Sequence, residues 1–245
     1  MTTPNQTLTP HDPMQPAINL SVWIRDTRTL SSRDTESARQ TLSIAEIAQA
    51  ESLRFPELRR DYIAAHDLLR KALTAHDPRH APESWAFATG VYGKPTLDID
   101  DKRSGMEFSL THTAGLVACA VSKAPVGIDV ERVSAGWDYK EVARRYFTVA
   151  EAESLTVLAP ELASARFVEL WTLKESFLKA VGCGLSGALD AVSFDAADAS
   201  RVQYTVHHSL YSRDWQFQLL SPSQDSRLAV AINSSLPMHV NIASF

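Results

Sequence analysis

Apolar and polar positions change their spacing along the chain, and these changes predict a mixture of helices and short strands. Residues 18–24 alternate apolar with polar side chains, as a strand with one buried face does. Residues 56–75 place Tyr62, Ile63, Leu69 and Leu73 on one helical face, which predicts a long amphipathic helix. A second long helix is predicted over 161–181. The two glycines of the segment 182–184, which follows directly, are expected to end it.

Two shorter helices are marked by the sequence pattern of a capping box. Ser43 is followed by Glu46, and Thr148 by Glu151. In this pattern the hydroxyl and the acidic side chain satisfy each other's backbone N–H groups at the start of a helix. The first of these helices is expected to end near Leu53. A further helix is predicted over 138–146.

The remaining apolar runs are short and are bounded by turn-forming residues, so they predict strands. Further strands are expected at 84–89, 106–110, 116–121, 126–133, 191–194, 202–207, 215–220 and 228–232. The segments 90–95 and 111–115 are interpreted as the turns between strands.

The order of these elements repeats along the chain. The sequence Ala-Glu-Ser-Leu occurs at 50–53 and again at 152–155, each time just before a long helix. The repeated order predicts two similar α+β halves, residues 18–125 and 126–245. A site between two such halves would lie in a natural cleft. Residues 1–17 are rich in Thr, Pro, Asn and Gln and are expected to form a loose tail.

Composition narrows the possible functions. The chain has 245 residues and a formal net charge of -5, which argues against a nucleic-acid-binding protein. It contains no run of about 20 apolar residues, as a membrane span requires, and no signal-peptide pattern at its start. Cys119 and Cys183 lack metal-ligand spacing, and we interpret them as free thiols of a cytoplasmic protein.

Asp129 and Glu131 are two residues apart on a predicted strand, so both carboxylates face the same side. A hard cation such as Mg²⁺ would relieve the repulsion between them, and it prefers oxygen ligands. The alternative is an ordinary solvated strand face.

Trp171, Glu175 and Lys179 follow one another at intervals of four residues on the second long helix, and therefore share one face. In most helices such a Glu–Lys pair is a surface ion pair of a few tenths of a kcal/mol.

Other residues suited to binding phosphate lie nearby in the sequence. The triplet Thr111-His112-Thr113 combines hydroxyls, an imidazole and the N–H groups of the expected turn. Lys94 lies in a tight turn between a glycine and a proline. The densest basic stretch of the chain flanks and includes the first long helix, and its arginines are either a solvated face or an anchor for a phosphate. These basic residues are Arg54, Arg59, Arg60, Arg70 and Lys71.

Four of these segments together resemble the Sfp-type 4′-phosphopantetheinyl transferases. The matching segments are Tyr92-Gly-Lys-Pro95, Phe108-Ser-Leu-Thr-His-Thr113, Val126-Gly-Ile-Asp-Val-Glu131 and Trp171-Thr-Leu-Lys-Glu-Ser-Phe-Leu-Lys179. Their order and spacing also match, over about residues 54–190. The resemblance implies a pseudo-dimer of two α+β halves, each with a long helix on a small antiparallel sheet.

The resemblance also implies an activity. A serine of an apo acyl or peptidyl carrier protein would attack coenzyme A, take its 4′-phosphopantetheine arm and release adenosine 3′,5′-bisphosphate. Carriers of fatty-acid or secondary-metabolite synthesis fit this role equally well. The protein would act as a monomer, without nucleic acid or membrane partners.

Carried over by position, the family's roles fall on named residues. Asp129, Glu131 and Glu175 would ligate Mg²⁺, while Glu175 and Lys179 would be catalytic. Glu175 would remove the serine proton directly or, as we favour, through a bound water molecule. The residues implied to contact coenzyme A are Arg54, Arg60, Lys94, Thr111, His112, Thr113, Lys174 and Lys179.

One position departs from many relatives, which have an arginine nine residues before the position of Arg70. This chain has Asp61 there, so the choice of phosphate anchor among Arg54, Arg59 and Arg60 stays open.

Two alternatives to this activity remain. The first is a module that binds coenzyme A or a carrier without reaction. The second is a different Mg²⁺-dependent phosphoryl enzyme, although no Walker-type phosphate loop is present. Docking surfaces for a carrier are expected at 182–186 or 140–147.

Overall fold

The computed structural model describes residues 16–90, 92–98, 104–133, 139–184, 189–195, 202–211 and 213–244. Most of the predicted N-terminal tail, and the second part of the predicted docking segment 182–186, lie outside these ranges. The helices are α1 (Ser32–Arg39), α2 (Ile44–Ser52), α3 (Pro56–His76), α4 (Tyr139–Tyr146), α5 (Val149–Thr156) and α6 (Pro160–Val181). Short 3₁₀ turns occur at η1 (Thr27–Thr29), η2 (Pro82–Ser84), η5 (Leu189–Ala191) and η6 (Ser209–Tyr211).

The strands form two main sheets. Four strands are ordered β11 (Met238–Ser244), β1 (Ile18–Asp26), β5 (Leu116–Ser122) and β4 (Glu107–Thr113). Three others are ordered β6 (Val126–Arg132), β10 (Ser226–Asn233) and β9 (Trp215–Leu220). Two small hairpins complete the set, β2 (Phe87–Thr89) with β3 (Pro95–Leu97) and β7 (Val192–Asp195) with β8 (Gln203–Val206).

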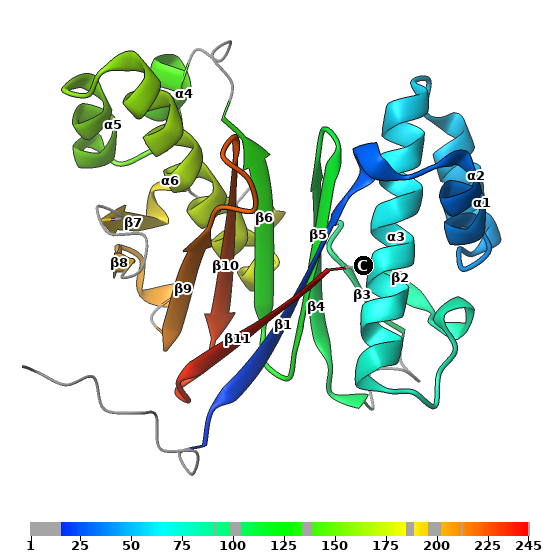
Figure 1. Cartoon of the computed structure of the whole chain (residues 1–245). Helices are drawn as coiled ribbons and strands as arrows, with labels where there is room; N and C mark the ends of the chain where they lie inside the picture. The colour runs from blue at the N-terminus through cyan, green and yellow to red at the C-terminus, as the bar shows by residue number, and fades with distance from the viewer. Residues whose placement is uncertain are drawn as a thin grey trace, which may run out of the picture.

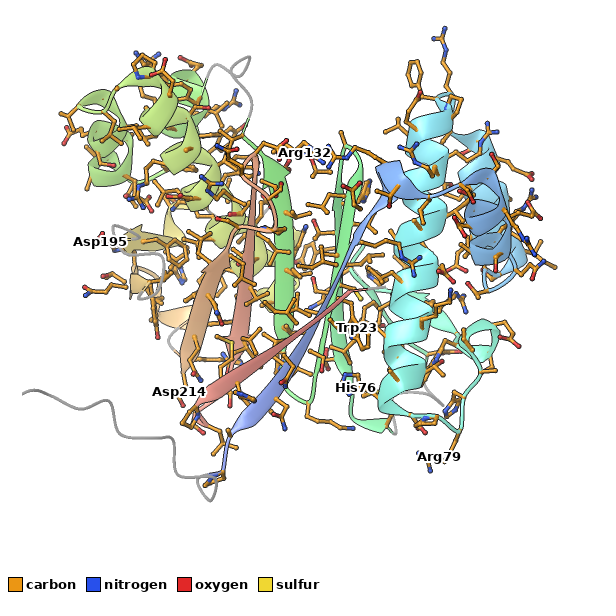
Figure 2. All side chains as sticks on the ribbon, in the orientation of Figure 1. Trp23, His76, Arg79, Arg132, Asp195 and Asp214 are labelled. Carbon is orange, nitrogen blue, oxygen red and sulfur yellow. The ribbon has the colours of Figure 1, made fainter. Side chains whose placement is uncertain are left out.

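The helices cover the outer sides of the two sheets. Figure 1 shows α1–α3 on one side of the molecule, α4–α6 on the other, and the main sheets between them. The inner faces of the sheets share one apolar cluster, in which Leu20 and Ala118 of the first sheet meet Ile128 and Val230 of the second. Side chains fill the space between the sheets in Figure 2. Separate clusters lie between α3 and the first sheet and between α6 and the second.

The predicted caps and helix ends are confirmed. Ser43 and Thr148 both accept from the backbone N–H three residues later, and Glu46 and Glu151 bond back to complete the capping boxes. Helix α6 ends at Gly182, whose φ of 80° is the left-handed conformation that favours glycine. The predicted mixture of helices and small sheets is therefore present.

Four expectations need correction. Strand β3 (Pro95–Leu97) was not predicted, and it begins at the end of the segment 90–95 that was expected to be a turn. The segment Ser32–Arg39 is a helix that the sequence reading missed. Strand β11 was also missed, and it pairs in parallel with β1, so the first sheet is mixed rather than antiparallel. This pairing places a segment of the expected second half in the sheet of the first half. Finally, Thr111-His112-Thr113 belongs to β4 rather than to a turn, because these residues continue the antiparallel pairing with β5.

Each half contains one buried acid–base pair at the same place in its element order. Arg70 of α3 is 1% exposed and bonds Glu46 of the first capping box over 2.7 Å. Lys174 of α6 is 0% exposed and bonds Glu151 of the second capping box over 2.9 Å. Both cations also donate to two backbone carbonyls, just before the following hairpin for Arg70, at 2.9–3.0 Å, and just before and at the start of the hairpin for Lys174, at 2.6–2.7 Å. Each pair therefore ties a short helix, a long helix and a hairpin together.

Candidate active site at the seam of the two sheets

The candidate site begins with an unusually close contact between β6 and α6. A Cβ atom on Gly127 would lie 1.9 Å from the backbone oxygen of Ser176 and 2.5 Å from the backbone nitrogen of Ala180. No side chain fits at these distances, so only glycine allows the strand and the helix to approach this closely. The approach brings the next residue on the same face of β6, Asp129, within reach of α6.

Asp129 and Glu131 share a face of β6 and lie close to Glu175 and Lys179 of α6. The Nζ atom of Lys179 donates to Oδ1 of Asp129 over 2.6 Å and lies 3.2 Å from the hydroxyl of Thr111. Within the described ranges, Oδ2 of Asp129 and Oε1 of Glu175 are buried and have no hydrogen-bond partner. Three carboxylates thus share one ammonium group, and two of their buried oxygens are left unsatisfied.

The electrostatics of the site reflect this excess of negative charge. Burial raises the pKa of Glu131 to about 7, and the neighbouring charge of Asp129 acts in the same direction. Burial and the charge of Asp129 also raise the pKa of Glu175 to about 7, although Lys179 opposes the shift. Buried unpaired carboxylates cost free energy unless a proton or a cation neutralises them. A cation held here would therefore be stabilised.

The donor set fits Mg²⁺ in chemistry, while the positions of the side chains fit it only in part. Carboxylate oxygens are the ligands that Mg²⁺ prefers, and unsatisfied buried oxygens are where such an ion gains most. However, no three His, Cys, Asp or Glu side chains of the described segments are arranged to hold one ion as they stand. Lys179 occupies one oxygen of Asp129. Holding Mg²⁺ would require the carboxylate oxygens that Lys179, Thr111 and Thr113 do not bind to converge on one point.

A cavity of about 260 Å³ opens beside the carboxylates. Its lining includes Lys94 and Phe108 from the first half and Glu175, Leu178, Lys179 and Gly182 from the second. Lys94 donates to the backbone oxygen of Val126 over 3.3 Å, and burial lowers the pKa of its ammonium group. A larger cavity of about 580 Å³, between α5, α6 and β7, contains none of the predicted site residues. Of these two cavities, the one beside the carboxylates has the residues suited to binding a phosphorylated ligand.

Not all predicted residues meet at this site. In the core of the second half, the Nζ atom of Lys174 contacts the backbone oxygens of Leu189 and Val192 and the carboxylate of Glu151. These three partners use all three N–H donors of the ammonium group, so none is left to bind a cofactor. Arg54 is exposed at the start of α3, with its guanidinium over the ring of Phe55 at 5.6 Å. These two residues therefore lie apart from the carboxylates.

The N-terminal part of α3 contains another candidate anchor, Arg60. Arg60 lies 3.4 Å from Asp61, and its Nε atom has no partner among the described residues. Asp61 is 2% exposed and accepts from the hydroxyl of Thr27 and, over 3.0 Å, from the backbone N–H of Gly115. The departure from the family at Asp61 thus has a structural role, since this carboxylate ties α3 to the β4–β5 turn.

The triplet Thr111-His112-Thr113 divides between the two sides of β4. The hydroxyls of Thr111 and Thr113 contact Asp129 and Glu131 over 3.1 and 3.2 Å. Phe108 and Leu110 belong to the apolar cluster against α3, and alternation places His112 on that same side. The backbone N–H groups of the triplet lie in a strand, so they do not form the expected phosphate cradle.

Sequence reasoning missed two residues that hold β4, β6 and α6 together around the site. The hydroxyl of Ser109 accepts the backbone N–H of Ile128 over 3.1 Å and helps to join β4 to β6. Gly127 allows the close contact described above, and its place between two apolar residues of a strand was the available signal.

Comparisons with a family profile and with individual proteins both find similarity to 4′-phosphopantetheinyl transferases. The profile described as the 4′-phosphopantetheinyl transferase superfamily matches residues 125–232. The 4′-phosphopantetheinyl transferase HetI of Nostoc sp. is 36% identical over 147 residues, covering 60% of this chain and 62% of the relative. A 4′-phosphopantetheinyl transferase of Bacillus subtilis is 32% identical over 136 residues, covering 56% and 58%. The transferase Sfp of Bacillus subtilis is 36% identical over 108 residues, covering 44% and 46%.

The matched part of the chain thus spans about three fifths of the length of HetI and of the second relative. The solved structure of Thermotoga maritima holo-[acyl-carrier-protein] synthase is 24% identical, with a TM-score of 0.37 over 47% of this chain and 64% of its own. Within the described segments, none of the helices combines the length and the apolar composition that crossing a bilayer requires.

Proposed function

The chain belongs to the 4′-phosphopantetheinyl transferase superfamily, and on that basis we propose that it is a 4′-phosphopantetheinyl transferase. It would move the phosphopantetheine arm of coenzyme A to a serine of an apo acyl or peptidyl carrier protein. Adenosine 3′,5′-bisphosphate would leave. One observation carries this proposal beyond family likeness: two buried carboxylate oxygens at the seam of the halves lack partners, beside a lysine and a cavity.

Asp129, Glu131 and Glu175 would hold Mg²⁺ in this proposal. Their buried, mutually repelling carboxylates support the assignment, because a divalent cation offsets that repulsion. When bound, Mg²⁺ would neutralise the negative charge of the coenzyme A pyrophosphate. The charge of Lys179 lies at the same place and would stabilise the leaving phosphate.

Glu175 is our candidate for accepting the serine proton. Without metal its pKa is raised to about 7 by burial and by Asp129, and a cation bound beside it would lower this pKa and keep the carboxylate ionised, as a proton acceptor must be. Its Oε1 atom has no partner among the described residues, so an acceptor position is available. The proton would pass directly or through a bound water molecule.

Lys94 and His112 would contact coenzyme A from the first half, while Lys179 would do so from the second. Lys94 and Lys179 line the same cavity from the two sides. Arg60 is favoured as the phosphate anchor over Arg54, because it is less exposed and its Nε atom has no partner among the described residues. Lys174 is not proposed to bind coenzyme A, because its donors are used in the core.

We also propose that the two halves form a pseudo-dimer. The repeated capping box, long helix and buried acid–base pair support this interpretation. A site that draws residues from both halves of one chain would allow the protein to act as a monomer.

The test is the intact mass of apo carrier proteins after incubation with coenzyme A and this protein. The carriers should include one fatty-acid carrier and one peptidyl carrier, each with Mg²⁺ and with excess chelator. A mass gain of one phosphopantetheine group that requires Mg²⁺ is expected for at least one carrier. Binding of coenzyme A without any mass gain, on several carriers, would contradict the proposal and favour a binding module.

A further inference from the structure

A row of three hydroxyls joins the edge of one main sheet to the edge of the other. Ser109, Thr111 and Thr113 alternate along β4, so their side chains share one face. The Ser109 hydroxyl accepts the N–H of Ile128 over 3.1 Å, and the Thr111 hydroxyl accepts the N–H of Val130 over 3.3 Å. Side chains of β4 thus bind backbone groups of β6 at the seam.

The Thr111 hydroxyl has a partner for its proton and for both of its lone pairs. A threonine hydroxyl has one proton to donate and two lone pairs that accept. Its proton goes to Oδ1 of Asp129 over 3.1 Å. Its lone pairs face the N–H of Val130 at 3.3 Å and the ammonium of Lys179 at 3.2 Å. Thr111 is also 4% exposed, so a ligand phosphate has little access to it.

Thr113 repeats this relation one step along the strand. Its hydroxyl donates to Oε2 of Glu131 over 3.2 Å. An ionised phosphate oxygen only accepts hydrogen bonds, so a hydroxyl whose single proton is on a carboxylate has none to offer it. Both threonines therefore face carboxylates of the second half in a manner that competes with phosphate binding.

We propose that Thr111 and Thr113 are positioning residues that hold Asp129 and Glu131 for the cation, and that they do not bind the phosphates of coenzyme A. The role of the two carboxylates rests on the proposed function. Thr111 has the larger effect, because one hydroxyl fixes Asp129, Lys179 and the backbone of β6 at once. The seam between the halves and the geometry of the charged site are therefore set by the same atoms.

The test compares Thr111→Val, which keeps the shape and removes the hydroxyl, with Thr111→Ser, which keeps the hydroxyl. Ser109→Ala is the matched control, because it removes the same kind of bond to β6 where no carboxylate takes part. Three kinds of measurement are made on the full chain. They are amide hydrogen exchange at Val130 and Ile128, the Kd for Mn²⁺ by electron paramagnetic resonance, and kcat and KM for coenzyme A.

Thr111→Val is expected to speed exchange at Val130 and to weaken Mn²⁺ binding by about tenfold or more, as loss of a group that orients a ligand does. Its kcat should fall while KM for coenzyme A stays within about threefold, since the hydroxyl orients the carboxylate rather than binding the phosphates. Thr111→Ser keeps the hydroxyl, so its amide exchange, its Kd for Mn²⁺ and its kcat and KM should equal those of the unaltered protein. Ser109→Ala should speed exchange at Ile128 and leave the Kd for Mn²⁺ unchanged. Thr113→Val should weaken Mn²⁺ binding less than Thr111→Val.

The opposite pattern would overturn the inference. If Thr111→Val binds Mn²⁺ as the unaltered protein does and instead raises KM for coenzyme A, the hydroxyl is a substrate contact. Equal loss of Mn²⁺ affinity in Ser109→Ala and Thr111→Val would also reject it, because the effect would then come from the seam in general. Exchange and Mn²⁺ binding do not depend on transfer, so they decide this inference even if no carrier is modified.

Discussion

The long helices of the two halves start alike and then diverge. Both α3 and α6 begin with Pro-Glu-Leu, at Pro56 and Pro160, and each follows a short helix with a capping box. Counted from these prolines, Arg70 and Lys174 occupy the same position. Each is a buried cation bound to the acid of its own capping box. The two halves therefore solve the same packing problem in the same way.

The residues that follow these cations separate the two helices. Lys71 stands at the position of Glu175, and Ala75 at that of Lys179. Lys71 forms an ion pair with Asp67, and the carboxylate of Asp67 also accepts from Arg25 and Thr41.

In α6, by contrast, Glu175 and the facing Asp129 each keep a buried oxygen without a partner among the described residues. The carboxylate of Asp67 on α3 is thus satisfied by three donors, whereas the carboxylates of Glu175 and Asp129 each keep an unsatisfied oxygen, as groups at functional sites often do.

Breaking the shared acid–base pairs should give the largest effect. Arg70→Met and Lys174→Met each leave a buried glutamate without its cation, which typically costs about 3–5 kcal/mol. We expect similar losses in the free energy of unfolding, measured by urea denaturation. A large loss in one variant and none in the other would show that the two pairs are not equivalent supports.

The second largest effect is expected on turnover and, of the two long helices, only for substitutions on α6. Glu175→Gln should lower kcat by about 10²–10³-fold, as removal of a general base or of a group that stabilises charge does. Coenzyme A affinity, measured by calorimetry, should change far less. Lys71→Gln is the matched control at the same position of α3, and its kcat should equal that of the unaltered protein. Survival of turnover in Glu175→Gln would remove the assignment of Glu175.

The smallest effect is a difference in pH dependence between the halves. The pKa of Glu175 and of Glu131 is about 7 in the folded protein, well above the ordinary value of 4.5. Between these values the folded state binds more protons than the unfolded state, so stability falls as the pH rises. The melting temperature of the metal-free protein should therefore fall from about pH 5 to about pH 7, and less steeply in Glu175→Gln.

Glu46 in the first half should act in the opposite direction. Burial acts to raise its pKa, but bonds from His66 and Ser43 and the charge of Arg70 lower it to about 2. Its contribution to stability is complete above pH 4.5 and is lost as the pH falls toward 2. Scanning calorimetry in chelator across this range measures both slopes. A flat profile between pH 5 and 7 would contradict the raised values in the second half.

Local signals in the sequence predicted much of the fold and part of the site. The capping boxes and the glycine after α6 act within a few residues, so they could be read directly. The shared face of Asp129 and Glu131 follows from the two-residue period of a strand, and the structure agrees.

Features that depend on contacts between distant segments could not be predicted. In the sequence, Lys174 cannot be distinguished from a lysine that binds a ligand. Only its hydrogen bonds to the backbone oxygens of Leu189 and Val192, which are distant in the sequence, show that it lies in the core. The triplet around His112 contains turn-like residues, but pairing with β5 holds it in a strand. The pairing of β11 with β1 leaves no local signal at either segment.

That pairing has a consequence for how the molecule is made. Ile18 lies beside Met238, about 220 residues away in the sequence, and β11 covers the edge of β1 that β5 leaves open. When only the first half has been synthesised, the edge of β1 that β11 will cover is still unpaired, and unpaired strand edges can pair with other chains. The first half can complete its sheet only after the whole of the second half has been synthesised, so assembly of this protein is delayed by its own topology.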